Sequence, residues 1–331
     1  MSTVELKPKD LKSNQEVRWC PGCGDYSILN SVQAVLAESG VKKENMCVIS
    51  GIGCSSRFPY YMGTYGFHSI HGRALAVATG TKAANPDLSV WVATGDGDCM
   101  SIGGNHFIHT LRRNLDVKIL MFNNQIYGLT KGQYSPTTPK GQVTKTSPYG
   151  AIDAPFHPLN LALGAGATFV ARTMDTQPKH MQKILKAAAE HKGTAFVEIW
   201  QNCVIFNDGA WKEWTTKEVR DDRTIDLVPG EPMLFGKDLE KGLHVECCET
   251  SIVGKEEATT WKADTASPVP GFLLAQLDNE PDLPNAIGIF RQVEQPTYDG
   301  LITEQIDQVT SKKGKGTLKS LIYTPDAWTV D

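Results

Sequence analysis

Residues 88–128 read LSVWVATGDGDCMSIGGNHFIHTLRRNLDVKILMFNNQIYG, and this stretch predicts a strand, a helix and a second strand. The apolar runs at 88–95 and 117–122 have the length and the apolar character of buried strands. Residues 101–114 between them suit a helix, and strands that are joined by a helical crossover run parallel in one sheet. The stretch therefore predicts a parallel α/β sheet.

The same alternation extends to both sides of this unit. Further strands are expected at 46–50, 167–172 and 194–200, and further helices at 25–40, 71–87 and 177–193. Strands that alternate with helices form a mainly parallel sheet that helices cover on both faces. The predicted fold class is therefore α/β, with a doubly wound, mainly parallel sheet in a domain of residues 1–225.

Residues 226–331 have a different composition, with many Pro, Gly, Glu and Lys residues and few long apolar runs. A short helix is expected at 271–280, and a strand, a loop and a helix are expected over 286–306. We expect this segment to be an irregular C-terminal extension that wraps the core or a partner chain.

Composition narrows the class of protein. The chain has 331 residues, of which 40% are hydrophobic and 21% are charged, so it can bury a sizeable core. Its formal net charge of -4 does not favour a nucleic-acid partner or a membrane surface. The first residues, MSTVELKPKDLKSN, lack the apolar segment of a signal peptide, and no apolar run is long enough to span a membrane. We therefore expect a cytoplasmic protein.

A CPGC pair at residues 20–23 raises the question of a cysteine-based centre. Two thiols at this spacing can form a disulfide, act as a redox dithiol, or bind zinc or an iron–sulfur cluster. A disulfide framework is disfavoured in a reducing compartment. The chain has eight cysteines, namely Cys20, Cys23, Cys47, Cys54, Cys99, Cys203, Cys247 and Cys248. Cys54 and Cys203 each follow an expected strand, so both should lie at the carboxyl edge of the sheet, where four thiolates suit either zinc or a [4Fe–4S] cluster.

The most informative polar residues also lie at the ends of strands. Gly95, Asp96 and Gly97 follow one strand, and Asn124 follows the next. Carboxylate and amide oxygens suit Mg²⁺, and glycines let a diphosphate approach the backbone. Each segment alone reads equally well as an ordinary turn. Together, in a strand–helix–strand unit, they predict a site for Mg²⁺ and a diphosphate.

The pair GDG…NN resembles the motif of thiamine diphosphate enzymes. By that resemblance Asp96, Asn124 and the carbonyl of Ile126 would hold Mg²⁺. Combined with WCPGCGDYSIL (19–29), GIGCSS (51–56) and HGRALAVATG (71–80), the motif resembles the β subunit of 2-oxoacid:ferredoxin oxidoreductases. The resemblance covers nearly the whole chain. Within this family, the sequence is most similar to the 2-oxoglutarate enzymes.

The resemblance implies a reaction and its partners. A 2-oxoacid, coenzyme A and oxidised ferredoxin would give an acyl-CoA, CO₂ and reduced ferredoxin, reversibly, with thiamine diphosphate, Mg²⁺ and one [4Fe–4S] cluster as cofactors. Cys20, Cys23, Cys54 and Cys203 would hold the cluster. The chain shows no second α/β unit to activate the aminopyrimidine, so the α subunit would supply it, in an αβ pair doubled by symmetry. Pyruvate or a broad range of 2-oxoacids stay open as alternative substrates.

The resemblance also assigns individual residues. Arg57 would meet the substrate carboxylate, unless it is a surface arginine, and His71 would contact the diphosphate or the reacting carbon, unless it caps a helix. The predicted cofactor-binding residues are Gly53, Ser55, His71, Gly95, Asp96, Gly97, Asp98, Asn124, Ile126, Tyr127, Gly128, Leu129 and Thr130. Two other classes remain: a cluster-free thiamine decarboxylase or synthase with structural zinc, and a non-catalytic electron-transfer subunit.

Overall fold

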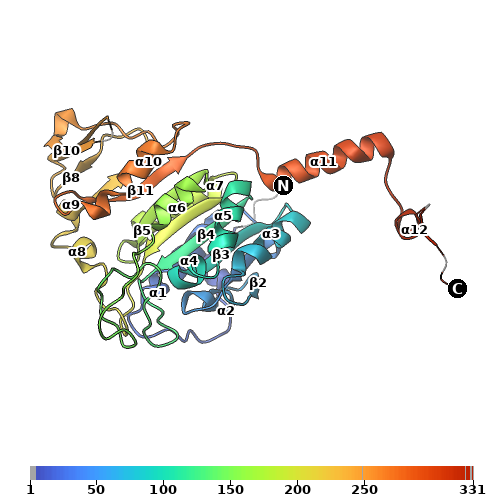
Figure 1. Cartoon of the computed structure of the whole chain (residues 1–331), viewed down its shortest axis with the longest axis horizontal. Coiled ribbons are helices and arrows are strands. Elements are labelled where there is room, and N and C mark those ends of the chain that lie inside the picture. Colours follow the sequence, from blue (N-terminus) through green and yellow to red (C-terminus); the bar gives the residue numbers. More distant parts are fainter. Residues whose placement is uncertain (1–4, 248, 325, 329, 331) are drawn as a thin grey trace.

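An eight-stranded sheet crosses the molecule in a computed structural model that describes residues 5–247, 249–324, 326–328 and 330 (Figure 1). The strand order is β2-β1-β3-β4-β6-β5-β11-β7. The strands are β1 (Met46–Ser50), β2 (Tyr65–His68), β3 (Ser89–Gly95), β4 (Val117–Asn123), β5 (Phe169–Met174), β6 (Ala195–Trp200), β7 (Thr224–Leu227) and β11 (Asn285–Gln292).

The strands from β2 to β5 in this order are parallel, which confirms the predicted doubly wound, mainly parallel sheet. Every residue of β1, β4, β5 and β6 is buried. This burial explains why their sequences are almost continuously apolar, since helices cover both faces of the sheet.

Helices α1 and α7 pack side by side on one face of the sheet, and α3, α5 and α6 cover the other (Figure 1). The α-helices are α1 (Asp25–Glu38), α2 (Phe58–Tyr61), α3 (Ala74–Ala84), α4 (Asp96–Met100), α5 (Gly104–Arg113), α6 (Pro158–Gly164), α7 (Pro178–Glu190), α8 (Lys212–Thr215), α9 (Arg220–Arg223), α10 (Val269–Leu274), α11 (Tyr298–Lys313) and α12 (Leu318–Ile322). Short 3₁₀ turns lie at Pro8–Leu11, Lys43–Asn45, Ser55–Arg57, Lys255–Glu257 and Leu277–Asn279. Within the described ranges, no helix is both long enough and apolar enough to cross a membrane.

The C-terminal part of the chain contributes to the main sheet. The strand expected near residue 286 is β11, which pairs antiparallel with β5 and parallel with β7. A separate antiparallel sheet contains β8 (Leu234–Phe235), β9 (Lys241–Glu246) and β10 (Glu249–Gly254). The division of the chain into domains 1–225 and 226–331 stays a prediction, but the second segment is built into the core through β11.

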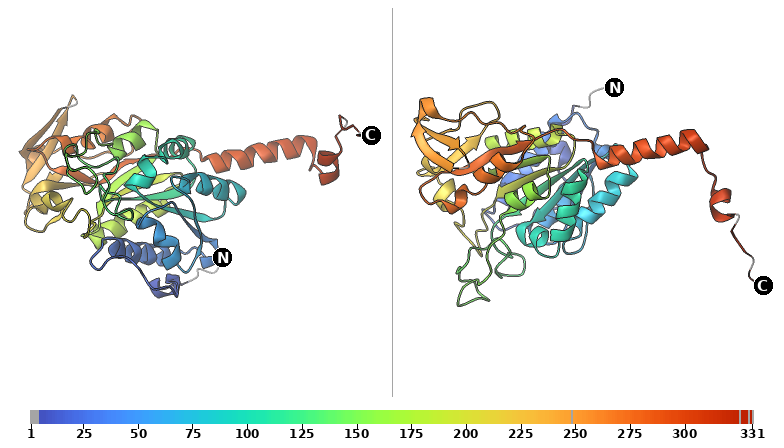
Figure 2. Two further views of the ribbon diagram at one scale, coloured as in Figure 1. Left: turned by 60° about the horizontal axis from the view of Figure 1, so that its bottom comes forward. Right: turned by 45° about the horizontal axis from the view of Figure 1, so that its top comes forward.

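The chain ends in an arm, which we define as α11 and α12. Figure 2 shows the arm extending away from the body in both views. It carries exposed apolar side chains, namely Leu301, Ile306, Val309, Leu318, Leu321 and Ile322. Its base is fixed to the body, because Asp299 Oδ1 accepts the Asp116 N–H at 3.0 Å and the Asn114 amide donates to the carbonyls of Gln295 and Pro296.

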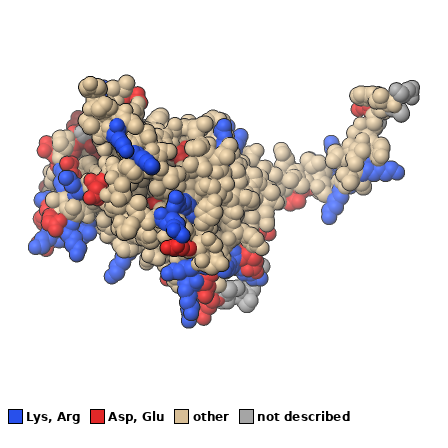
Figure 3. Space-filling view, turned by 90° about the horizontal axis from the view of Figure 1, so that it is seen from below, with Lys and Arg blue, Asp and Glu red and all other residues tan. Residues whose placement is uncertain are grey.

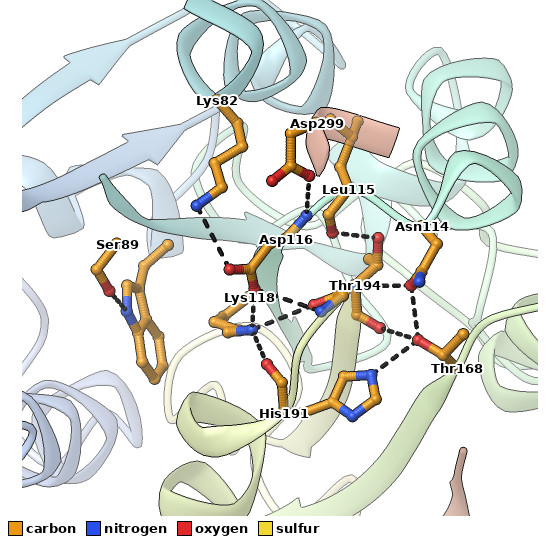
Figure 4. A network of polar contacts seen from close by, with 12 residues as sticks. Lys82, Ser89, Asn114, Leu115, Asp116, Lys118, Thr168, His191, Thr194 and Asp299 are labelled. Carbon is orange, nitrogen blue, oxygen red and sulfur yellow. Dashed lines mark hydrogen bonds and ion pairs between the residues drawn. The ribbon is translucent and has the colours of Figure 1, made fainter. Parts of the chain in front are cut away.

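A buried polar network closes the amino ends of the strands (Figure 4). Lys118 Nζ lies 2.7 Å from Asp116 Oδ1 and donates to the His191 carbonyl, while Lys82 Nζ lies 3.4 Å from the same carboxylate. These cations hold the pKa of Asp116 below its usual range, although burial opposes the shift. Burial and the Lys118 charge lower the pKa of His191 to about 4. These contacts join α3, the start of β4 and the segment before β6 at this edge of the sheet, whereas the carboxyl edge carries the predicted site.

Candidate functional site

A cavity of about 540 Å³ lies at the carboxyl ends of β1, β3 and β4. Ligands of open α/β sheets bind at this edge. The predicted cofactor-binding residues all line it: Gly53, Ser55, His71, Gly95, Asp96, Gly97, Asp98, Asn124, Ile126, Tyr127, Gly128, Leu129 and Thr130. The juxtaposition of these residues is therefore as predicted, and their contacts with a cofactor stay predictions. A larger hollow of about 1170 Å³, lined by residues that include Trp261 and Arg291, lies elsewhere and contains none of them.

Asp96 is held at the base of the cavity by two hydroxyl groups. Ser135 Oγ donates to Asp96 Oδ2 at 2.5 Å, and Thr137 Oγ1 donates to the same oxygen at 2.6 Å. Only 2% of Asp96 is exposed, and burial raises its pKa to about 6 against the opposing effect of the two hydroxyls. A carboxylate that is desolvated to this degree is suited to a cation, which would stabilise its charged form.

Asn124 and Ile126 add two oxygen atoms that could bind a metal ion beside Asp96. The Ile126 N–H donates to Asn124 Oδ1 at 3.2 Å, and the two residues share the loop that follows β4. A carboxylate, an amide oxygen and a main-chain carbonyl are ligands that Mg²⁺ accepts. A glycine is required at position 97, next to Asp96, because an added Cβ would lie 2.2 Å from the ring of Tyr127. The Tyr127 hydroxyl donates to the Gly97 carbonyl. The residues present therefore fit a magnesium–diphosphate site.

Asp98 lines the cavity, but its carboxylate is used to hold the surrounding loops. Oδ1 accepts the N–H groups of Ile52 at 3.1 Å and Gly72 at 2.7 Å, and Oδ2 accepts the Thr94 hydroxyl at 3.0 Å. These bonds connect the loop after β1, the turn before α3 and the end of β3. The structure thus gives Asp98 a positioning role that sequence reasoning had not foreseen.

Three of the cysteines predicted to bind a cluster are half-buried, and the fourth, Cys20, is exposed. The Cys23 N–H donates to the Cys20 carbonyl at 3.1 Å in one tight turn, and Trp19 Nε1 donates to the Cys54 carbonyl at 2.7 Å. An added Cβ at Gly128 would lie 3.4 Å from Cys203 Sγ and 3.9 Å from Cys54 Sγ, so the two sulfurs flank this glycine. The turn that carries Cys20 and Cys23 is therefore joined to the loop of Cys54, beside the cavity.

The electrostatics of these thiols link them to one another. Burial and the nearby Asp25 raise the pKa of Cys54 to about 12, and the same two causes raise the pKa of Cys23 further. Cys203 contributes to both shifts. Among the described side chains, no three His, Cys, Asp or Glu residues converge as ligands of a single ion. A [4Fe–4S] cluster makes a different demand, because each thiolate binds its own iron atom.

The other cysteines have different surroundings. Cys47 and Cys99 are buried in the hydrophobic core, and Cys247 is exposed. Cys248 lies outside the described residues.

Of the two predicted catalytic residues, His71 lines the cavity and Arg57 does not. His71 lines the cavity in the turn before α3, so it does not open that helix. Arg57 is absent from the residues that line the cavity as described, and its Nη1 donates to the Arg18 carbonyl at 3.1 Å. The assignments of both residues to substrate or cofactor stay predictions.

Several residues of the site were missed by sequence reasoning. Ser135 and Thr137 reach Asp96 from a long loop, and Gln201 reaches Asn124 from the end of β6. Sequence reasoning gave none of these three residues a role in the site. The position of Gln201 directly after a predicted strand was the one available signal, since side chains at the carboxyl edge converge there.

Comparison with known proteins gives the following matches. The family model of the thiamine pyrophosphate enzyme C-terminal TPP-binding domain matches residues 51–199. The chain is 51% identical to the 2-oxoglutarate oxidoreductase subunit KorB of Mycobacterium tuberculosis, over 98% of this chain and 89% of that protein. It is 38% identical to the 2-oxoacid:ferredoxin oxidoreductase subunit beta of Saccharolobus solfataricus, over 80% of this chain and 88% of that protein.

A solved structure matches almost the whole fold. It is a 2-oxoglutarate:ferredoxin oxidoreductase from Magnetococcus marinus with 2-oxoglutarate, coenzyme A and succinyl-CoA bound. The match has a TM-score of 0.76 and 36% identity, and it covers 96% of this chain and 95% of that one.

Proposed function

The chain belongs to the family of 2-oxoacid:ferredoxin oxidoreductase β subunits, and from this premise we propose that it acts with an α subunit on 2-oxoglutarate. The products would be succinyl-CoA, CO₂ and reduced ferredoxin, with coenzyme A as co-substrate. The choice of 2-oxoglutarate is supported by the similarity to the Mycobacterium 2-oxoglutarate oxidoreductase subunit and to the Magnetococcus 2-oxoglutarate:ferredoxin oxidoreductase. The observation that carries the proposal is the single cavity that brings Asp96 and Asn124 together beside Cys54.

In this proposal Asp96, Asn124 and the Ile126 carbonyl hold Mg²⁺, which in turn holds the diphosphate of thiamine diphosphate. When bound, thiamine diphosphate supplies the electron sink that a 2-oxoacid needs in order to lose CO₂. Ser135 and Thr137 fix the Asp96 carboxylate toward the cavity, and burial makes that carboxylate a strong partner for a cation. Asp98 joins the two glycine-containing loops by accepting the N–H groups of Ile52 and Gly72, and these loops would border the diphosphate.

Cys20, Cys23, Cys54 and Cys203 hold the [4Fe–4S] cluster in this proposal. Burial and the nearby Asp25 raise the pKa values of Cys23 and Cys54, so loading iron would release the protons of these two thiols. Cys54 both lines the cavity and flanks Gly128 opposite Cys203. This position would keep the cluster within a short electron-transfer distance of the cofactor.

An α subunit would cover the open side of the cavity. Apolar side chains are exposed on the loops around it, including Ile70, Ile102, Leu129 and Ile152. Figure 3 shows the molecule from below, where Lys, Arg, Asp and Glu are scattered among uncharged residues. Exposed apolar side chains beside a cavity favour a protein partner. We propose that this partner supplies the group that activates the aminopyrimidine, since the chain itself offers no second unit of that type within its described part.

The test is to produce the chain together with its α subunit and to measure ferredoxin reduction with several 2-oxoacids. We expect the highest kcat/KM with 2-oxoglutarate, a requirement for coenzyme A, and no turnover by the β chain alone. A preference for pyruvate would revise the substrate, and turnover by β alone would refute the shared site. Iron and zinc analysis of the same sample distinguishes the cluster from the zinc alternative.

A further inference from the structure

The side-chain amide of Gln201 lies between the two predicted cofactor sites. Gln201 follows β6 directly and is 1% exposed. Its Oε1 accepts a hydrogen bond from Asn124 Nδ2 at 2.7 Å, and its Nε2 lies 3.3 Å from Cys23 Sγ. The same Nε2 donates to the Asn202 carbonyl at 2.5 Å. One buried amide therefore contacts a predicted Mg²⁺ ligand and a predicted cluster ligand.

The contact with Asn124 determines which end of the asparagine amide is available to a cation. Gln201 Oε1 can only accept a hydrogen bond, so the group of Asn124 that faces it has to be the NH₂. The Asn124 oxygen is then directed to the other side, where it accepts the Ile126 N–H. Only the oxygen of an amide binds Mg²⁺. The Gln201 contact therefore favours the orientation of Asn124 that can act as a ligand.

The contact with Cys23 acts on the charge of the sulfur. An N–H group that donates to a thiolate stabilises negative charge on it, and hydrogen bonds to the sulfurs are one determinant of the reduction potential of an iron–sulfur cluster. The reduced cluster carries one more negative charge than the oxidised one, so it gains more from the donor. The amide of Gln201 should therefore raise the potential of a cluster bound at Cys23.

On the basis of the proposed function, we propose that Gln201 is a positioning residue that serves both centres. It orients Asn124 for Mg²⁺ with its oxygen and supports the Cys23 thiolate with its nitrogen. Its own orientation is fixed because Asn202 accepts from the nitrogen end, so neither contact can reverse without losing the other. Gln201 is thus a physical link between diphosphate binding and cluster potential.

Two substitutions separate the two contacts in the complete αβ complex. Gln201→Leu has a similar volume and removes both contacts, whereas Gln201→Glu keeps an oxygen for Asn124 and removes the amide donor. The measurements are the Mg²⁺ dependence of thiamine diphosphate binding by calorimetry and the cluster potential by a redox titration followed by EPR. Gln177→Leu is a matched control, because Gln177 Nε2 lies 3.5 Å from the Met174 sulfur, away from the predicted ligands.

We expect Gln201→Leu to weaken the affinity for Mg²⁺ by about 10–100-fold, which is the usual effect of removing a group that orients a metal ligand. Gln201→Glu should bind Mg²⁺ within about threefold of the unmodified complex. In both variants the cluster potential should shift to a more negative value, and Gln177→Leu should change neither quantity. Unchanged Mg²⁺ affinity in Gln201→Leu, an unchanged potential in Gln201→Glu, or equal Mg²⁺ losses in both variants would overturn the inference. If the unmodified complex lacked thiamine diphosphate or iron, the proposed function itself would fail instead.

Discussion

Replacing Asp98 with alanine would remove three hydrogen bonds that hold the walls of the cavity. The N–H groups of Ile52 and Gly72 and the hydroxyl of Thr94 would all lose their acceptor. Asp98 is 6% exposed, so bulk water does not replace it freely. The change should therefore affect both the stability of the chain and the shape of the site.

The size of the effect follows from these contacts. A hydrogen bond to a charged group contributes about 1.5–3 kcal/mol, but the loops can relax and water can enter from the cavity, so the three losses do not add fully. We expect Asp98→Ala to lower the free energy of unfolding by about 3–4 kcal/mol. Asp98→Asn keeps one oxygen for the two N–H groups and should lower it by only about 1 kcal/mol.

The assay is urea unfolding of the two variants beside the unmodified chain, followed by calorimetric titration of thiamine diphosphate into the assembled complexes. The alanine variant should also bind the cofactor at least about tenfold more weakly, because a loss of about 1.4 kcal/mol in binding is tenfold. A stability loss below about 1 kcal/mol in Asp98→Ala, together with normal cofactor affinity, would refute the positioning role.

Four further outcomes are expected. Asp96→Ala should abolish Mg²⁺-dependent binding of thiamine diphosphate while the iron content stays normal; normal affinity would rule out its role as a metal ligand. Cys203→Ala should lose most of the iron and the ferredoxin-linked activity, whereas Cys99→Ala should keep both; a full set of iron atoms in Cys203→Ala would assign the fourth ligand elsewhere. Arg57→Ala should raise the KM for the 2-oxoacid more than that for coenzyme A, and an unchanged KM would leave Arg57 as a structural contact of Arg18. Burial and the Lys118 charge lower the folded-state pKa of His191 to about 4, so the free energy of unfolding should fall by about 3 kcal/mol as the pH falls from 6.5 toward 4. His191→Gln should remove this part of the pH dependence of urea unfolding. An identical pH profile in the variant would contradict the prediction.

The pattern of strands and the edge that carries the site could be predicted from the sequence. Strands such as β4 are buried on both faces, so their apolar runs are continuous and easy to recognise. Asp96 and Asn124 could be placed together because the carboxyl ends of neighbouring parallel strands meet at one edge. Local order along the chain was enough for these inferences.

Features that depend on contacts between distant segments were missed. β11 inserts between β5 and β7, antiparallel to β5 and parallel to β7, and no local signal specifies these neighbours. The bonds of the Asp98 carboxylate to backbone groups 46 and 26 residues away in sequence were not foreseen, and its predicted contact with the cofactor stays a prediction. Ser135 reaches Asp96 from a loop 39 residues further along the chain. Side-chain partners of this kind are set by the packing of loops, which has no periodicity.

The C-terminal arm has a consequence for how the protein is maintained in a cell. Its base is bonded to the body through Asp299, but its apolar side chains, such as Leu318 and Leu321, lie outside the chain's own core. A copy without a covering surface would present these side chains to proteases and to other unassembled copies. We expect copies whose arm is covered by another surface to have a longer half-life than copies whose arm is exposed. Unassembled copies should therefore be degraded first.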